Sequence, residues 1–307
     1  MRSEEHTLVE EELISKKDEP VNKSAEITNT PESITAEEHL IAEKPRCLDE
    51  DYEMVYHKPK TMVDVSMHYC PGCAHSLLHK LIMEAVDELG IQDKTIGVAP
   101  VGCAVFAYDY MNIDMTEAAH GRASATATGI KRLLPDSYVF TYQGDGDLAA
   151  IGIAETIHTI NRGENIAIFF MNNAVYGMTS GQMAPTSLIG MKTTTSPYGR
   201  DVHEYGEPIK VSELISHLPG SFYVTRQAVN SATAVRKAKK AIMNAFKYQK
   251  LNKGTCFVEI IGNCPSNWKM TPLEASKFID SEMIKVFPLG DIKLPKGEDL
   301  KLLEEVK

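Results

Sequence analysis

The sequence predicts a single α/β domain built on a doubly wound, mostly parallel sheet, and two observations carry this prediction. Residues 137–143 and 165–171 are short, nearly continuous runs rich in β-branched and aromatic residues, the composition of parallel strands buried on both faces. Helical segments separate these and the other predicted strands, and the alternation shows no internal repeat. In a sheet of this kind, ligands bind outside the carboxyl ends of the strands.

The first half of the domain is expected to alternate helix and strand from residue 76 onward. Helix 76–89 has an apolar face and ends before Gly90, a residue that suits the left-handed conformation at a helix end. Strand 95–99 follows, and then a helix rich in small residues that ends at Leu134. After strand 137–143, Asp147 is the expected N-cap of a helix that runs to about residue 161 and leads into strand 165–171.

The second half opens on residues 183–207, a long segment without periodicity. In a compact domain such a segment is typical of a functional loop or a partner-contact surface. From residue 269 the chain is predicted to be a polar tail with one short helix near 272–280, so the folded domain is expected over 52–290 and a charged tail over 291–307. The elements predicted between the loop and this tail are helix 210–217, strand 221–226, helix 231–250 with a basic exposed face, and strand 255–261.

Residues 1–51 form an acidic extension that is predicted to be disordered. Residues 1–60 hold 16 Asp and Glu against 8 Lys and Arg, and the first fifty residues contain no Phe, Tyr or Trp. Such a segment buries too little apolar surface to offset its ordering entropy. A net charge of −10 without a basic stripe disfavours nucleic acid as a partner. No apolar run approaches the roughly 18 residues of a membrane span and no signal core is present, so we expect a cytoplasmic protein without a membrane partner.

Polar, glycine-rich corners follow the two central strands. The motif GDGD occupies 144–147 and the motif NN occupies 172–173. Gly144 and Gly146 would let backbone N–H groups approach an anion at a helix start, where the helix dipole favours phosphate. A bare phosphate would be repelled by Asp145, so the pattern suits phosphate only when a cation lies between the two.

Mg²⁺ would provide such a cation, because it takes oxygen ligands from one or two carboxylates and from substrate phosphates. The predicted ligands are the Asp145 carboxylate, the Asn173 amide oxygen and a neighbouring backbone carbonyl such as that of Val175. A diphosphate would complete the coordination shell. The alternative is a loop cap and an Asx-turn that share a β-α-β unit without binding a ligand.

Four of the six cysteines fall at turns or strand ends. Cys70 and Cys73 flank a Pro-Gly turn, while Cys103 and Cys264 each follow a predicted strand. Four thiolates could bind a 4Fe-4S cluster or zinc, or could remain unpaired thiols. A disulfide is disfavoured in a cytosolic chain.

One histidine and one arginine lie at the start of the small-residue helix. His120 could contact a substrate carboxylate or move protons, and a helix cap or a surface residue is the alternative. Arg122 could pair with phosphate or carboxylate, and a surface ion pair is equally compatible with its position.

Several motifs together resemble a known family, the β (thiamine diphosphate-binding) subunit of 2-oxoacid:ferredoxin oxidoreductases. GDG and NN, with Asp145 and Asn173 twenty-eight positions apart, are similar to the thiamine diphosphate motif of the wider superfamily. The resemblance covers about 52–289, leaves residues 1–50 outside, and is greatest to the 2-oxoisovalerate (3-methyl-2-oxobutanoate) branch, with the 2-oxoglutarate branch second. The motifs that carry it, in the order of the family, are HYCPGCAH, APVGCAVFAY, EAAHGRA, TYQGDGDLA, NNAVYGMTSGQMAPTS, TTTSPYGRD and CPSNW.

The resemblance implies thiamine diphosphate, Mg²⁺ and a 4Fe-4S cluster as cofactors. Asp145, Asn173 and the Val175 carbonyl would bind Mg²⁺, and His120 would meet the 2-oxoacid. The cysteines that would bind the proximal cluster are Cys70, Cys73, Cys103 and Cys264. The residues that would line thiamine diphosphate are Gly102, Cys103, Gly121, Arg122, Gly146, Asp147, Gly177 and Met178.

The implied activity is oxidative decarboxylation of a 2-oxoacid, either a branched-chain acid such as 2-oxoisovalerate or 2-oxoglutarate, to acyl-CoA and CO₂. Electrons would pass through the cluster to ferredoxin. The implied partners are an α subunit that completes the thiamine site, a γ or ferredoxin-like subunit, ferredoxin and coenzyme A. Two alternatives stay open at this point: a non-redox thiamine diphosphate-dependent decarboxylase or carboligase subunit, and a zinc-stabilised binding module.

Overall fold

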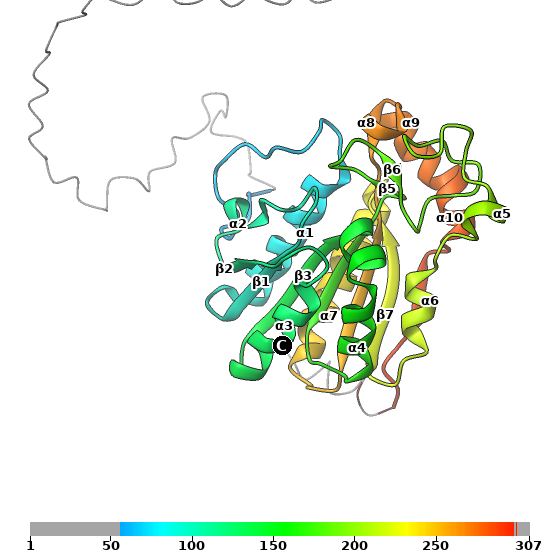
Figure 1. Cartoon of the computed structure of the whole chain (residues 1–307). Helices are drawn as coiled ribbons and strands as arrows, with labels where there is room; N and C mark the ends of the chain where they lie inside the picture. The colour runs from blue at the N-terminus through cyan, green and yellow to red at the C-terminus, as the bar shows by residue number, and fades with distance from the viewer. Residues whose placement is uncertain (1–55, 298, 300–307) are drawn as a thin grey trace, which may run out of the picture. The chain divides into compact units, whose positions relative to one another are not determined.

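A seven-stranded sheet organises the part of the chain that the computed structural model describes, residues 56–297 and 299 (Figure 1). The strand order is β2-β1-β3-β4-β8-β7-β9, and every neighbouring pair is parallel except β7 and β9. The predicted disordered extension lies outside the described residues. The strands of this sheet are β1 (Thr95–Ala99), β2 (Asp114–Glu117), β3 (Tyr138–Gly144), β4 (Ala167–Asn172), β7 (Ser221–Ala228), β8 (Thr255–Ile261) and β9 (Gly290–Lys293).

Helices cover both faces of the sheet, as the doubly wound prediction requires, and a short antiparallel pair of strands lies above its carboxyl edge (Figure 1). That pair is β5 (Val175–Tyr176) and β6 (Gln182–Met183). The α-helices are α1 (Ala74–Leu89), α2 (Ala107–Tyr110), α3 (Ala123–Leu133), α4 (Ile153–Asn161), α5 (Val202–Tyr205), α6 (Val211–Ser216), α7 (Ala232–Gln249), α8 (Pro265–Trp268), α9 (Pro272–Phe278) and α10 (Ile284–Val286). A 3₁₀ turn (Gln92–Lys94) and two π-helices (Asp145–Ile151 and Ile279–Met283) complete the elements.

The sheet separates two hydrophobic cores, one on each face. Phe169 and Met171 of β4 belong to the core formed with α1 and α7, whereas Ile168 and Phe170 of the same strand belong to the core formed with α3 and α6. Every side chain of β4 is therefore buried. This explains why the strand was recognisable as a continuous apolar run.

The helix that follows β3 begins differently from the prediction. A π-helix covers Asp145–Ile151 with Gly144 at its N-terminus, and α4 begins only after Gly152. Asp147 lies inside the π-helix, so its prediction as an N-cap is wrong. Its carboxylate accepts hydrogen bonds from groups on other segments, and these outweigh a capping preference worth about 1 kcal/mol.

The prediction of a polar tail from residue 269 onward is also wrong. Ile279, Met283 and Phe287 are buried in a third hydrophobic core with Trp268. They recur every four residues, so they form one apolar stripe in a segment that is otherwise charged. Strand β9 then joins the sheet, so residues 291–293 are part of the fold and not of the charged tail.

Strand β2 and helix α2 were also missed because they are short, as were β5, β6, α5 and α8. Strand β2 contains the sequence DMTE at the edge of the sheet, where no side chain is fully buried, and α2 has four residues. The other predicted helices and strands are present, with ends that differ by a few residues. The long aperiodic segment 183–207 contains only the end of β6 and the four residues of α5, as predicted.

Candidate active site

A cavity of about 260 Å³ lies at the carboxyl ends of β1, β3 and β4, which are adjacent strands. The predicted strand ends therefore meet at one edge of the sheet, where ligands of such folds bind. The predicted site residues that line this cavity are Gly102, Cys103, His120, Gly144, Asp145, Gly146, Asp147, Asn173, Val175, Gly177 and Met178.

Three oxygen atoms converge at one wall of the cavity, which we call the oxygen corner. The amide oxygen of Asn173 faces the Val175 carbonyl oxygen at 2.8 Å and Asp145 Oδ2 at 2.7 Å, and an exchange of its amide oxygen and nitrogen would turn both contacts into hydrogen bonds. In octahedral Mg²⁺ with bonds of about 2.0–2.1 Å, neighbouring ligand oxygens lie about 2.9 Å apart. The donor set and its spacing fit a magnesium ion.

Asp145 is the only charged member of the oxygen corner, and it is 3% exposed. Burial raises the pKa of its carboxyl to about 7. Hydrogen bonds from Thr186 Oγ1 at 2.7 Å and Asn173 N at 3.0 Å favour the ionised form and only partly oppose this rise in the pKa. A carboxylate whose hydrogen bonds do not offset its desolvation is stabilised by a cation placed against it. The electrostatics of the corner agree with its oxygen geometry.

The turn that presents Asn173 has an unusual backbone. Ala174 has a φ of 56°, a left-handed conformation that costs a residue with a Cβ roughly 1–2 kcal/mol. Asn172 Oδ1 accepts a hydrogen bond from Ala174 N at 3.1 Å, and Ser187 Oγ donates to Ala174 O at 2.6 Å. Trp268 Nε1 donates to Asn173 O at 3.1 Å. These three hydrogen bonds hold the strained turn in place.

A second buried carboxylate, that of Asp147, orients His120. Asp147 Oδ1 lies 2.8 Å from His120 Nδ1 and accepts from the backbone N–H groups of Gly121 at 2.8 Å and Val101 at 3.2 Å. Its Oδ2 accepts from Gln143 Nε2 at 2.6 Å. Because a carboxylate only accepts hydrogen bonds, Nδ1 is the donor and Nε2 is the acceptor of the neutral His120 ring. The ring lines the cavity in this fixed orientation.

Two residues predicted to line thiamine diphosphate, Gly121 and Arg122, do not reach the cavity. Gly121 has a φ of 76°, and a Cβ there would lie 2.7 Å from Gly152 N, so the glycine permits close packing against the end of the π-helix. Arg122 Nη1 forms an ion pair with Glu155 Oε1 at 2.9 Å. Of the two interpretations that the sequence left open for Arg122, the structure supports the surface ion pair.

The four predicted cysteines lie close enough for their charges to interact, and all four are free thiols. Burial raises the pKa of the Cys73 thiol to about 11, and the charges of Cys264 and Cys70 add to the rise. Burial raises the pKa of the Cys103 thiol to about 12, and the charges of Cys73, Cys264 and Cys70 add to the rise. Thiols in such a group are poorly ionised by themselves, and metal binding, which takes the thiolate, would offset this cost.

A single tetrahedral zinc needs its sulfur ligands about 2.3 Å from one point. In the part of the chain that the structure describes, no group of three or more His, Cys, Asp or Glu side chains converges on an ion position. Cys103 Sγ and Cys264 Sγ instead face the backbone of Gly177, where a Cβ would lie 2.9 Å and 3.7 Å from them. Asn267 Nδ2 donates to Cys264 Sγ at 3.3 Å and to Gly177 O at 2.8 Å. A Cβ at position 177 would therefore press against the Cys103 thiol.

Sequence reasoning missed three residues of the site. His75 lines the cavity and its Nδ1 hydrogen-bonds the Tyr142 hydroxyl, while burial lowers the pKa of its ring to about 3. Thr186 donates a hydrogen bond to Asp145, which lies 41 positions earlier in the chain, and Ser187 donates one to Ala174, which lies 13 positions earlier. His75 and this Thr-Ser pair lie in motifs that the sequence analysis singled out, but no local pattern indicates their partners.

The fold and the oxygen corner define a cofactor-binding enzyme domain with its site at the carboxyl edge of a parallel sheet. The family described as "Thiamine pyrophosphate enzyme, C-terminal TPP binding domain" matches residues 100–260. The chain belongs to this family and, within it, to the 2-oxoacid:ferredoxin oxidoreductase subunits. The resemblance seen in the motifs is thereby confirmed.

Three relatives show the extent of the similarity. Ketoisovalerate oxidoreductase subunit VorA of Methanothermobacter thermautotrophicus is 46% identical over 259 residues, 81% of this chain and 54% of the relative. 2-Oxoglutarate synthase subunit KorB of Methanocaldococcus jannaschii is 33% identical over 234 residues, 76% and 81% of the two chains. A solved 2-oxoglutarate:ferredoxin oxidoreductase from Magnetococcus marinus, with 2-oxoglutarate, coenzyme A and succinyl-CoA bound, is 25% identical with a TM-score of 0.64, over 83% of this chain and 91% of that one.

The chain spans about half the length of the ketoisovalerate relatives that it matches. Among residues 56–297 and 299, no helix is both long enough and apolar enough to cross a bilayer.

Proposed function

We propose that the chain is the thiamine diphosphate-binding subunit of a 2-oxoacid:ferredoxin oxidoreductase, which converts a 2-oxoacid to acyl-CoA and CO₂ and transfers the electrons to ferredoxin. The observation that carries this proposal is that Cys103, one of four neighbouring thiols, lines the same cavity as the oxygen corner. An oxygen corner alone would serve any enzyme of this family. A metal-binding group of thiols at the same cavity would add a route for electrons.

In this proposal Asp145, Asn173 and the Val175 carbonyl hold Mg²⁺, which in turn binds the diphosphate. Bound thiamine diphosphate supplies the electron sink that decarboxylation of a 2-oxoacid needs. The chain contributes close backbone approach at Gly144, Gly146 and Gly177 on the cavity wall, and a Cβ at Gly146 would lie 3.2 Å from the Tyr176 ring. Gly121 and Arg122 lie outside the lining of this cavity.

His120 is the residue of this chain proposed to meet the substrate. Its ring lines the cavity and the Asp147 carboxylate holds it through Nδ1, so Nε2 can accept a proton or, when protonated, donate to a carboxylate. The hydrogen bonds to Gly121 and Val101 restrain Asp147 in turn. The histidine is therefore oriented before a substrate arrives.

Cys70, Cys73, Cys103 and Cys264 are proposed to bind a 4Fe-4S cluster. A zinc-stabilised binding module would not account for the oxygen corner at the cavity that Cys103 also lines, which disfavours that alternative. The interacting thiols likewise disfavour a non-redox decarboxylase or carboligase subunit, for which they would have no use.

The substrate and partners are proposed from the relatives. Greater identity to the ketoisovalerate subunit than to the 2-oxoglutarate subunit favours a branched-chain 2-oxoacid, with 2-oxoglutarate second. The relatives are named as subunits, which supports a complex in which an α subunit completes the thiamine site and a γ or ferredoxin-like subunit carries electrons. Coenzyme A and ferredoxin complete the reaction in this proposal, and we expect the complex to be cytoplasmic.

The test is the iron, acid-labile sulfide and zinc content of protein purified without oxygen. We expect about four irons and four sulfides in the wild type, and their loss in Cys264→Ala. Cys256→Ala is the matched control, because Cys256 is fully buried within β8 among apolar residues of the core, and it should retain the iron. Zinc in place of iron, or equal iron in all three proteins, would refute the cluster assignment.

A second assay tests the substrate. Ferredoxin reduction by the assembled complex should be faster with 2-oxoisovalerate than with 2-oxoglutarate and should require coenzyme A. Preference for 2-oxoglutarate would overturn the branched-chain assignment, and turnover by this chain alone would overturn the proposed need for an α subunit.

A further inference from the structure

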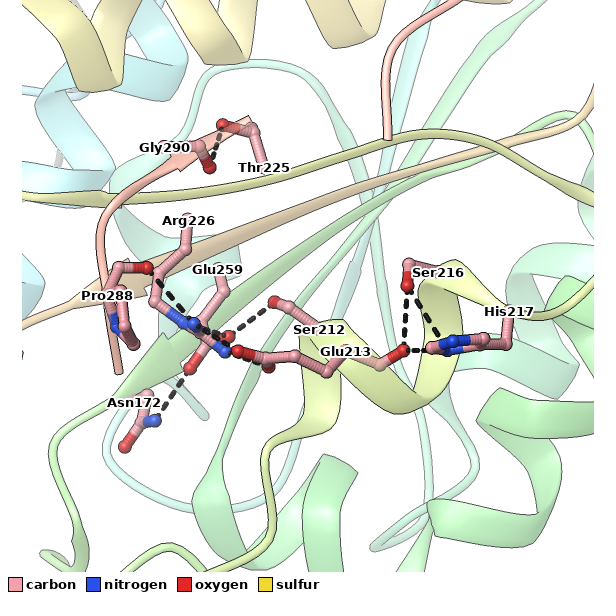
Figure 2. Close-up of polar contacts among 10 residues, drawn as sticks. All are labelled: Asn172, Ser212, Glu213, Ser216, His217, Thr225, Arg226, Glu259, Pro288 and Gly290. Carbon is pink, nitrogen blue, oxygen red and sulfur yellow. Dashed lines mark hydrogen bonds and ion pairs between the residues drawn. The ribbon is translucent and has the colours of Figure 1, made fainter. Parts of the chain in front are cut away.

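A fully buried ion pair lies beside the turn that carries the oxygen corner (Figure 2). Arg226 of β7 and Glu259 of β8 occupy paired positions on adjacent strands, and Arg226 Nε donates to Glu259 Oε2 at 2.8 Å. Asn172, the last residue of β4, connects the pair to a third strand: it is in register with Ile261, two positions beyond Glu259, and its Nδ2 donates to Glu259 Oε1 at 2.7 Å. All three side chains are inaccessible to solvent.

The charges of this pair are satisfied by further partners. The guanidinium of Arg226 also binds both carboxylate oxygens of Glu213 on α6 and donates to Pro288 O at 3.1 Å. Ser212 Oγ, on the same helix, donates to Glu259 Oε2. Buried ion pairs of this kind contribute little net stability compared with apolar residues of similar volume. The effect of this pair on the site is therefore the geometry that it imposes on neighbouring side chains.

The carboxylate of Glu259 imposes an orientation on Asn172. An ionised carboxylate only accepts hydrogen bonds, so Asn172 must turn its NH₂ group toward it. The amide oxygen of Asn172 then points the other way and accepts from Ala174 N at 3.1 Å. A reversed amide would place its oxygen against Glu259 and its NH₂ group against the Ala174 N–H, so the reversed state is disfavoured at both ends.

We propose that Asn172, oriented by the Glu259–Arg226 pair, is a positioning residue for the magnesium site. It holds Ala174 in the left-handed conformation and so directs the Asn173 amide oxygen and the Val175 carbonyl toward Asp145. Each contact from Arg226 through Glu259 and Asn172 to Ala174 is a hydrogen bond between buried groups, and Ala174 is joined through the backbone to Asn173 and Val175. The inference rests on the proposed function, in which the oxygen corner holds Mg²⁺.

The experiment measures thiamine diphosphate affinity by calorimetry on the complex purified with the full chain, stripped of cofactor and supplied with saturating Mg²⁺. Asn172→Ala should weaken binding about tenfold, the effect of about 1.4 kcal/mol. Asn165→Ala is the matched control: this asparagine is also buried and bonds a backbone carbonyl, Gln249 O at 2.8 Å, but it precedes the opposite end of β4. The control should bind within twofold of the wild type.

Two further variants keep the proposal testable if Asn172→Ala does not fold. Glu259→Gln is isosteric, but the NH₂ group of the glutamine must face either the Asn172 NH₂ group or the donors of Arg226 and Ser212. This variant should therefore also weaken binding several-fold. Glycine adopts the left-handed conformation without steric cost, so adding Ala174→Gly to Asn172→Ala should recover a large part of the lost affinity. A residue with a general structural role would show no such rescue.

The outcomes separate the inference from the proposed function. Failure of the wild-type complex to bind thiamine diphosphate with Mg²⁺ would overturn the proposed function. The positioning role alone would be overturned by tight binding in the wild type together with equal affinity in Asn172→Ala or in Glu259→Gln. The same conclusion would follow if Ala174→Gly, added to Asn172→Ala, recovered none of the lost affinity.

Discussion

Replacing Arg200 with lysine would test how the long loop 183–207 supports the site. Arg200 is 5% exposed, and two of its acceptors, the carbonyls of Pro185 and Ser187, flank Thr186, which donates to Asp145. The loop conformation is thus linked to the oxygen corner. The six backbone carbonyls that accept from the Arg200 guanidinium are those of Ala184, Pro185, Ser187, Tyr205, Gly206 and Glu207.

The magnitude follows from the donors that lysine lacks. A lysine ammonium carries three donors at one point, so at least three of the six carbonyls would lose their partner. At about 1–1.5 kcal/mol for each lost hydrogen bond, Arg200→Lys should destabilise the closed loop by about 3–5 kcal/mol. Carbonyls released to the surface can bind water, so we expect local opening of the loop and not global unfolding.

Native-state hydrogen exchange measures this opening directly. The amides of Gly190 and Ile209, which donate within and just after the loop, should exchange about 10²–10⁴ times faster in Arg200→Lys, while amides of β4 should be unchanged. Arg162→Lys, at a half-exposed arginine that pairs with the buried Glu164 away from the loop, is the control and should leave these rates as they are. Loop exchange within threefold of the wild-type rate would refute the idea that Arg200 holds the loop.

Three other predictions concern single positions. Gly177→Ala should displace the Cys103 thiol, since its Cβ would lie 2.9 Å from Sγ, and should lower the bound iron by at least about half; unchanged iron would contradict this. Gly129→Ala, in an exposed turn of α3 with open space around the Cβ, should raise the free energy of unfolding in urea by about 0.5–1 kcal/mol, and a decrease would count against it. Burial holds the pKa of His79 well below its ordinary value, so its ring is neutral in the folded state and takes up a proton on unfolding below about pH 6.5. The wild type should therefore lose about 2 kcal/mol more than His79→Phe between pH 7 and pH 5, and parallel pH profiles would exclude that assignment.

The sequence alone determined the central architecture and the position of the oxygen corner. Residues 166–171 are apolar at every position, and so short a run, rich in isoleucine and phenylalanine, favours a strand buried on both faces. Parallel strands that neighbour each other end at the same edge of a sheet, so the residues that follow β3 and β4 had to lie together. Asp145 and Asn173 could be paired for that reason, although twenty-eight positions separate them.

Only the tertiary structure decided which polar residues serve the site and which serve the fold. Asp147 has the local features of a helix cap, yet partners from two other segments make it the support of His120. Local preferences of this size, about 1 kcal/mol, give way to several hydrogen bonds with a buried carboxylate. The same holds for the Arg226–Glu259 pair and for Thr186, because each hydrogen-bonds a partner that lies far away in the sequence. Burial makes these hydrogen bonds important for the site, and a local sequence pattern does not reveal burial.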